Sequence, residues 1–172
     1  MTRRTCLRLL AALTSLTTLT TLGLAGCGFQ LRGAATYAFS SMYLNSSASP
    51  SFNNEMRRAL AGAGSATLTE TAAAAQVTLD IPIVQDDKEV LSLSSAGAVR
   101  EFQLIKRVSF RLHDNDGGEW MPPGEITIRR AYTFNETQAL ARDLEEQRLQ
   151  RDMQTDAIQQ IVRRLQSARK PV

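Results

Sequence analysis

The sequence predicts an α+β fold, a two-layer sandwich in which two helices cover one face of a mixed or antiparallel sheet of about four strands. Three observations support this class. Several segments alternate apolar and polar residues with the period of a half-buried strand. A short segment beginning at Phe52 and a long C-terminal segment instead repeat apolar residues at helical spacing. The apolar stripe of the long helix needs a sheet to cover, which separates helices and strands into two layers.

The N-terminus has the features of an export signal. Three arginines within the first eight residues precede an uncharged stretch rich in Leu, Ala and Thr over residues 9–24. Threonines dilute this stretch, which falls short of the ~20 mainly apolar residues that a membrane-spanning helix needs. We therefore predict a lipoprotein signal peptide over residues 1–26, which is removed by cleavage before Cys27.

Residues 24–27, Leu-Ala-Gly-Cys, have the small-residue pattern of a lipidation site. The chain has two cysteines, and Cys6 lies in the segment that cleavage removes. Cys27 is then left without an internal disulfide partner, which argues against an ordinary secretory signal followed by a structural cysteine. Acyl chains such as palmitate on Cys27 would anchor the protein, because each buried methylene contributes about 0.8 kcal/mol to membrane binding. By resemblance to the sorting rules of Gram-negative lipoproteins, Gly28 implies the outer membrane.

Processing also changes the charge balance. The net charge of +3 comes from the removed segment, since losing its three arginines from 20 Lys+Arg leaves 17 against 17 Asp+Glu. The processed protein is therefore near neutral, and we expect no nucleic-acid partner. We predict a lipidated tether over residues 27–40 and a single domain over residues 41–170.

The first elements of this domain are a short strand and a helix. Residues 42–44 predict the strand, which the Ser-rich segment 45–51 ends. Residues 52–63 carry apolar side chains at helical spacing. Ser51 is the expected N-cap of this helix, and the glycines that follow at 62 and 64 are stop signals.

The next alternating segment covers residues 77–83, where apolar residues at odd positions share the predicted buried face. Pro82 marks this strand as an edge strand or a bulge, because proline cannot donate to the ladder. A polar bend is expected at residues 85–89, after which residues 90–93 continue the strand.

Two further strands follow, joined by a turn. Residues 102–112 predict one strand, interrupted by Lys106, and residues 126–134 predict another, interrupted by Arg130. Between them, the Asp and Gly content of residues 114–118 predicts a tight hairpin turn. A calcium loop is the alternative, but the segment lacks the alternating acidic positions and the terminal glutamate of such loops.

The last element is a long helix. Residues 136–169 contain no Pro or Gly, and Asn135 with Gln138 predicts a capping box at the start. A helix of ~33 residues is about 50 Å long. The expected apolar stripe consists of Leu140, Leu144, Met153, Ala157, Ile158, Ile161, Val162 and Leu165.

The sequence offers no catalytic constellation, so we expect a protein that is not an enzyme and needs no cofactor or metal. His113 is the only histidine and lies at a strand end, where an exposed or hydrogen-bonded ring is expected. The sequence contains no nucleophile motif, phosphate-binding glycine loop or Cys/His metal spacing. The carboxylate pairs 86–87 and 145–146 predict solvated surface, because neighbours in sequence do not face one another.

Three segments carry a family resemblance. Residues 27–32 are Cys-Gly-Phe-Gln-Leu-Arg, residues 101–104 are Glu-Phe-Gln-Leu, and Tyr-Thr-Phe at 132–134 runs into Ala-Leu-Ala-Arg-Asp at 139–143. In order and spacing over most of the processed chain, they resemble the LPS-assembly lipoprotein LptE family. The resemblance implies a small sandwich domain that sits as a plug inside the LptD β-barrel of the outer membrane. It also implies that the domain supports assembly of the barrel and contacts lipopolysaccharide on its way to the outer leaflet.

The resemblance further implies which residues contact lipopolysaccharide, a phosphorylated and acylated glycolipid that requires cations beside apolar surface. The basic residue at the family's Ala-Leu-Ala-Arg position is Arg142. The family's second basic position falls near Ser95, which is not basic. Arg100, Lys106 and Arg107 are close enough along the chain to take its place. For each of these cations, an ordinary surface charge is the alternative.

Two other functions stay open at this point. A non-catalytic lipoprotein subunit of another envelope assembly machine would share the anchor and the composition but would lack affinity for lipopolysaccharide. A lipoprotein enzyme acting on the cell wall or on lipid would depend on His113 or on the paired carboxylates.

Overall fold

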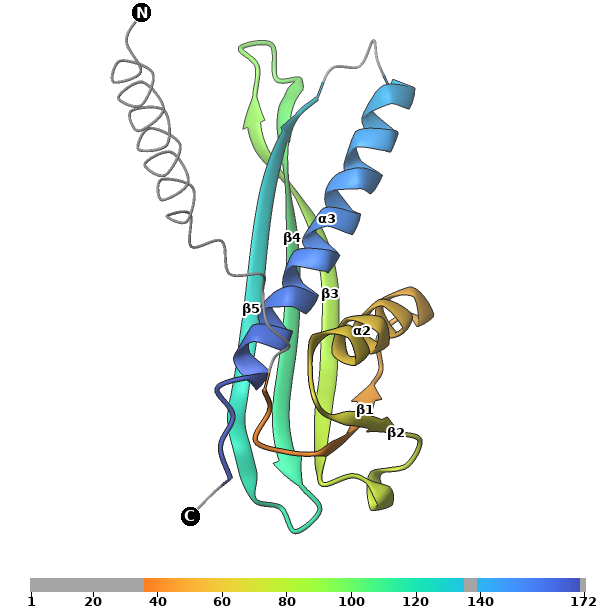
Figure 1. Cartoon of the computed structure of the whole chain (residues 1–172). Coiled ribbons are helices and arrows are strands. Elements are labelled where there is room, and N and C mark those ends of the chain that lie inside the picture. Colours follow the sequence, from red (N-terminus) through yellow and green to blue (C-terminus); the bar gives the residue numbers. More distant parts are fainter. Residues whose placement is uncertain (1–35, 135–138, 171–172) are drawn as a thin grey trace, which may run out of the picture. The chain divides into compact units, whose positions relative to one another are not determined.

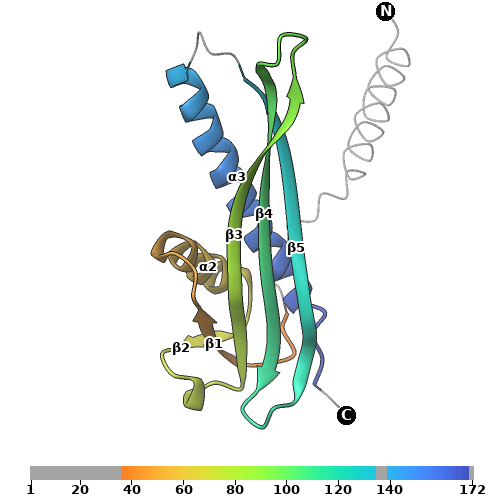
Figure 2. The same ribbon diagram turned by 180° about the vertical axis from the view of Figure 1, so that it is seen from behind.

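The structure, a computed structural model, describes residues 36–134 and 139–170. The signal peptide, Cys27 and the expected capping residues Asn135 and Gln138 lie outside these ranges. The predicted two-layer α+β sandwich is confirmed, with two helices packed against one face of a mixed sheet (Figure 1). Figure 2 shows the opposite face, with the strands in front of both helices.

Over the described residues the sheet has five strands, slightly more than the four expected, in the order β2-β1-β3-β4-β5. Their bounds are β1 Ser41–Ser46, β2 Thr67–Thr69, β3 Val77–Leu93, β4 Val99–Asp114 and β5 Glu119–Thr133. β1 pairs in parallel with β2 and β3, whereas β3, β4 and β5 are antiparallel neighbours. The unexpected strand is β2, which is too short to show an alternating pattern and is followed by the 3-10 helix η2 (Ala72–Ala74).

The first helix, α2, spans Pro50–Ala63. Its N-cap is Ser49, whose hydroxyl accepts a hydrogen bond from the backbone N–H of Phe52 at 3.3 Å. The prediction of Ser51 as N-cap was therefore wrong by two residues. Pro50 occupies the first helical position, where its missing N–H costs nothing. The buried face of the helix consists of Phe52, Met56 and Leu60.

β3 is one continuous strand, so the predicted bend at residues 85–89 was wrong. These residues pair in register with residues 103–107 of β4. Their polar character reflects exposure, because this half of β3 has no strand on its other side among the described residues. Charged side chains on such an edge are a common protection against pairing with other chains.

Pro82 marks a bulge, as the sequence predicted. The β1 partner ends opposite Ile81, and the pairing with β4 shifts between Asp80 and Ile83. One extra residue exchanges the two faces of a strand. Ile83 was expected on the buried face but is 49% exposed, while Val84 packs against the core.

The turn between β4 and β5 is the predicted hairpin turn. The backbone N–H of Asp114 donates to the carbonyl oxygen of Gly118 at 2.9 Å, and Gly117 has a φ of 87°. The Asp114 carboxylate accepts hydrogen bonds from the backbone N–H groups of Asp116 and Gly118, and so stabilises the turn. β5 begins at Glu119, earlier than the predicted residue 126, because this edge strand tolerates two prolines.

The long helix α3 spans Ala139–Leu165 in the structure and ends before the predicted residue 169. Its apolar stripe is confirmed over the C-terminal half, where five side chains are at most 1% exposed: Met153, Ala157, Ile158, Ile161 and Leu165. Leu144 is 62% exposed, so the stripe does not extend to it. α3 therefore joins the apolar core through its C-terminal half.

The described end of the predicted tether belongs to this core. Tyr37 and Phe39 are buried and their rings stack with centroids 5.0 Å apart. Phe39 also meets the edge of Trp120 at 6.0 Å. These aromatic contacts fix the chain to the sheet just before β1 begins at Ser41.

Lys106 is the unusual member of the helix-facing side of β4. It lies between Leu104 and Val108 on the same face of the strand, and its side chain is only 3% exposed. Its ammonium lies 2.5 Å from the Asp86 carboxylate, directly opposite on β3, and the Asp86 side chain is 52% exposed. Within the part of the chain that the structure describes, this buried cation therefore has one carboxylate partner, which is itself half-exposed.

We predict opposite effects when the two partners are changed. Asp86→Ala leaves the Lys106 charge buried and unpaired, which should lower the free energy of unfolding by about 2–3 kcal/mol. Lys106→Met leaves Asp86 in contact with water and should be neutral or stabilising. Urea unfolding of both variants tests this, and a larger loss for Lys106→Met would contradict it.

Candidate functional site

At the end of the sheet where β3 turns into β4, the N-terminal turns of α3 lie beside the strands (Figure 1). We call this end the tip. Five side chains there form what we call the tip cluster: Lys88, Phe102, Tyr132, Phe134 and Glu146. The Lys88 ammonium lies 2.6 Å from the Glu146 carboxylate, and the Tyr132 hydroxyl donates to the same carboxylate oxygen at 2.5 Å.

Aromatic rings surround the lysine. Its ammonium lies 4.3 Å from the centroid of the Phe102 ring and 5.6 Å from that of Tyr132. Phe102 is directly opposite Tyr132 in the register and meets Phe134 edge-on, with centroids 5.2 Å apart. Since rings attract cations through their faces, the cluster holds the Lys88 ammonium in a defined position.

The tip cluster is charged at neutral pH. Partial burial alone would lower the pKa of Lys88, but the hydrogen bond and charge of Glu146 outweigh burial and raise it. Burial likewise would raise the pKa of Glu146, yet Lys88 and Tyr132 lower it. Burial and the neighbouring Glu146 both raise the pKa of Tyr132, which stays a hydrogen-bond donor. The cluster therefore contains an ammonium, a carboxylate and a neutral phenol.

Exposed apolar side chains accompany this cluster. Five large apolar side chains are exposed among the described residues, and four of them lie at the end of β3 or the start of α3. These four are Val90 (52%), Leu91 (48%), Leu93 (58%) and Leu144 (62%). Apolar surface beside cations is the chemistry that an acylated, phosphorylated ligand requires.

Two of the predicted contact residues lie near the tip cluster. Arg142 is one helical turn before Glu146, on the same face of α3, and its side chain is 17% exposed. Its guanidinium lies 3.7 Å from the Glu145 carboxylate. Arg100 is exposed at the start of β4, and its carbonyl oxygen accepts from the backbone N–H of Phe134 at 2.6 Å.

The other two predicted cations are engaged elsewhere. Lys106 is buried against Asp86, and Arg107 pairs with Asp87 on the opposite face of the sheet. Ser95, where the resemblance expects a second basic residue, is exposed in the turn between β3 and β4. The structure therefore brings Arg142 and Arg100 to the tip, but not Lys106 or Arg107.

Sequence reasoning missed that the Glu146 carboxylate pairs with Lys88. Glu145 and Glu146 were both expected on solvated surface, and Glu145 is 51% exposed, but Glu146 is only 20% exposed and contacts the sheet. A signal existed, since Glu146 is seven residues before the buried Met153, the spacing of one helix face. The sequence did not show that Lys88 of β3 lies opposite Glu146.

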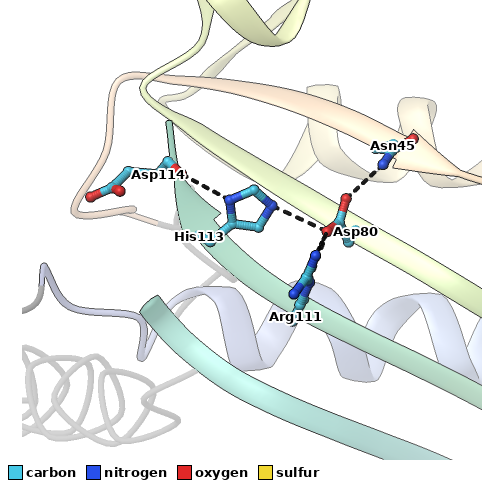
Figure 3. Close-up of polar contacts among 5 residues, drawn as sticks. All are labelled: Asn45, Asp80, Arg111, His113 and Asp114. Carbon is cyan, nitrogen blue, oxygen red and sulfur yellow. Dashed lines mark hydrogen bonds and ion pairs between the residues drawn. The ribbon is translucent and has the colours of Figure 1, made fainter. Parts of the chain in front are cut away.

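A second polar network lies on the face of the sheet without helices (Figure 3). The Asp80 carboxylate accepts hydrogen bonds from Asn45 at 2.7 Å and Arg111 at 2.8 Å, and His113 Nε2 lies 3.1 Å from it. His113 Nδ1 is 2.8 Å from the backbone oxygen of Asp114. Burial would raise the pKa of Asp80, but Asn45, Arg111 and the charge of His113 outweigh it and lower the pKa.

This network joins β1, β3 and β4, and the prediction that His113 is hydrogen-bonded is confirmed. Shallow depressions of 430 Å³ and 440 Å³ flank Asp80 and Arg111.

The described residues contain no group of three side chains that could hold a metal ion, and none of their helices is long and apolar enough to cross a membrane.

Stability should fall in acid because of this network. The stabilisation from a carboxylate with a lowered pKa is complete above its unfolded value of about 3.9 and is lost as the pH falls through the folded value. Asp80→Asn should therefore lower the melting temperature at pH 7 and flatten its decline between about pH 5 and pH 2. Thermal melts followed by circular dichroism test this, with the exposed Asp116→Asn as control. An equally steep decline in Asp80→Asn would refute the assignment.

Comparison with known proteins identifies relatives. The family model described as LptE, lipopolysaccharide-assembly, matches residues 39–165. The LPS-assembly lipoprotein LptE of Photorhabdus laumondii is 28% identical over 143 residues, which cover 82% of this chain and 78% of that protein. The solution structure of an uncharacterized lipoprotein B from Nitrosomonas europaea matches with a TM-score of 0.71 and 34% identity, covering 81% of this chain and 91% of that one. The crystal structure of the rare lipoprotein B from Shewanella oneidensis matches with a TM-score of 0.64 and 26% identity, covering 74% and 95%.

Proposed function

This chain belongs to the LptE family of lipopolysaccharide-assembly lipoproteins, and from that premise we propose that it is the plug and assembly partner of an LptD-like outer-membrane β-barrel. In this role it takes part in moving lipopolysaccharide to the outer leaflet, without catalysing a reaction. Lipid on Cys27 anchors it to the outer membrane, facing the periplasm and lying inside the barrel.

The observation that carries the lipopolysaccharide part of this proposal is the composition of the tip. Exposed Val90, Leu93 and Leu144 offer apolar contacts for acyl chains, and Arg142 and Arg100 offer charge for phosphate. Guanidinium groups match phosphate oxygens with parallel hydrogen bonds, which makes arginine suited to this task. Arg142 is the principal contact in this proposal, and Arg100 is a second one at the start of β4.

The partner assignment is tested by co-purification. We expect that the full-length protein, tagged at the C-terminus and extracted in mild detergent, brings a large outer-membrane barrel with it in near-equal amount. Mass spectrometry and densitometry of the purified complex measure this. Recovery with a different envelope complex would instead favour the non-catalytic subunit of another assembly machine.

The Cys27→Ala variant separates the anchor from the partner. Without acyl chains, the protein should leave the membrane fraction when the barrel is depleted and stay with the barrel when it is present. Immunoblots of fractionated cells measure the distribution. If the variant stays in the membrane fraction without the barrel, lipid on Cys27 is not the anchor.

Arg142→Gln should weaken lipopolysaccharide binding by about three- to tenfold, because one charge-assisted contact to phosphate is lost. The matched control is Arg148→Gln on the same helix, whose side chain is 79% exposed and pairs only loosely with Asp152 at 3.9 Å. Titration of labelled lipopolysaccharide in detergent measures both. Equal affinities for the two variants would remove Arg142 from the contact set.

A further inference from the structure

We infer that Lys88 is a further phosphate-binding cation of the tip, and that Glu146 competes with the phosphate of the ligand for it. In this arrangement the carboxylate holds the ammonium while the site is empty and gives it up to a phosphate group of the bound glycolipid. The inference rests on the proposed function, because it specifies how the same surface binds its ligand.

Lys88 has the position that such a contact needs. Its side chain is 39% exposed, in contrast to the 3% of Lys106, so a ligand can reach it. It is two residues before the exposed Val90, and residues two apart in a strand lie on the same face. The ammonium therefore lies beside apolar surface, and the Phe102 ring beneath it limits its movement.

Glu146 resembles the group that it would give way to. It presents a carboxylate oxygen 2.6 Å from the lysine, where a phosphate oxygen would make the same charge-assisted hydrogen bond. An ammonium has three donors, so a phosphate can approach before the carboxylate has left. A phosphate monoester near neutral pH carries more negative charge than a carboxylate, which favours the exchange.

The exchange does not require α3 to leave the sheet. The same Glu146 oxygen accepts from the Tyr132 hydroxyl at 2.5 Å, and this hydrogen bond can hold the carboxylate after Lys88 has turned to a ligand. Tyr132 is buried at 6% exposure and its position on β5 is fixed by the sheet. The helix thus keeps one contact to the sheet at this point in both states.

The alternative is that Lys88 and Glu146 only fasten α3 to the sheet. The two roles predict different changes in ligand affinity when the charges are removed one at a time. For a fastening pair, removing either charge lowers stability and moves ligand affinity in the same direction. For a competing carboxylate, Glu146→Gln removes the competitor and the repulsion of phosphate, whereas Lys88→Gln removes the binding group.

The experiment measures binding of phosphorylated lipopolysaccharide, and of the same material after phosphatase treatment, to the full processed lipoprotein in detergent. We expect Glu146→Gln to bind the phosphorylated form about threefold more tightly and Lys88→Gln about threefold more weakly. Lys88→Arg, which keeps the charge, should bind within about twofold of the unaltered protein. Asp152→Asn, a charge removal at a side chain that is 67% exposed on the same helix, is the control. All differences should vanish with the dephosphorylated material.

The outcomes separate the two proposals. If the unaltered protein does not bind lipopolysaccharide, the proposed function and the inference both fail. If it binds but Glu146→Gln weakens binding or leaves it unchanged, the inference alone fails. A melting temperature measured for each variant confirms that the compared proteins are folded, and Lys88→Arg supplies the comparison should Lys88→Gln not fold.

Discussion

The packing of α3 on the sheet is the interaction on which the rest of the structure depends. In its C-terminal half, Met153, Ile158 and Ile161 are almost fully buried, and each such side chain contributes about 1.5–3 kcal/mol. Closer to the tip, α3 contacts the sheet through the ion pair of Lys88 with Glu146 at 2.6 Å, whose side chains are 39% and 20% exposed. Such pairs contribute at most about 1 kcal/mol each. The helix is therefore held strongly at one end and weakly at the other.

The bulge at Pro82 divides the sheet in the same way. Before it, β3 lies between β1 and β4, and Val77, Leu79 and Ile81 supply buried side chains. Beyond it, β3 has β4 as its neighbour and carries charged residues that contact α3 or water. The end of the sheet that holds β1 is therefore mainly apolar core, whereas the tip combines polar side chains with exposed apolar ones. Under the proposed function, a stable fold and a surface for an amphipathic ligand would thus be kept in different parts of the domain.

Much of this fold is local in origin, and that part could be predicted. Alternation in β4 and β5, helical spacing in α3 and the Asp/Gly turn at 114–118 each follow from a few neighbouring residues. The continuity of β3 could not, because its charged residues pair with β4 through contacts that no local pattern shows. The same holds for the site. Arg142 followed from the family resemblance, whereas the contact of Lys88 with Glu146 joins residues 58 positions apart.

The burial of Tyr37 and Phe39 sets the length of the connection between the folded domain and the proposed lipid anchor at Cys27. Only residues 28–36 separate Cys27 from the first of these aromatic anchors, and a chain of that length extends at most about 35 Å. With the proposed lipid on Cys27, the folded domain would stay within about that distance of the bilayer. Confinement of this kind raises the effective concentration of the protein toward anything embedded in the same membrane. The anchored protein would then find an embedded barrel by diffusion in the plane of the membrane, even when few barrels are present.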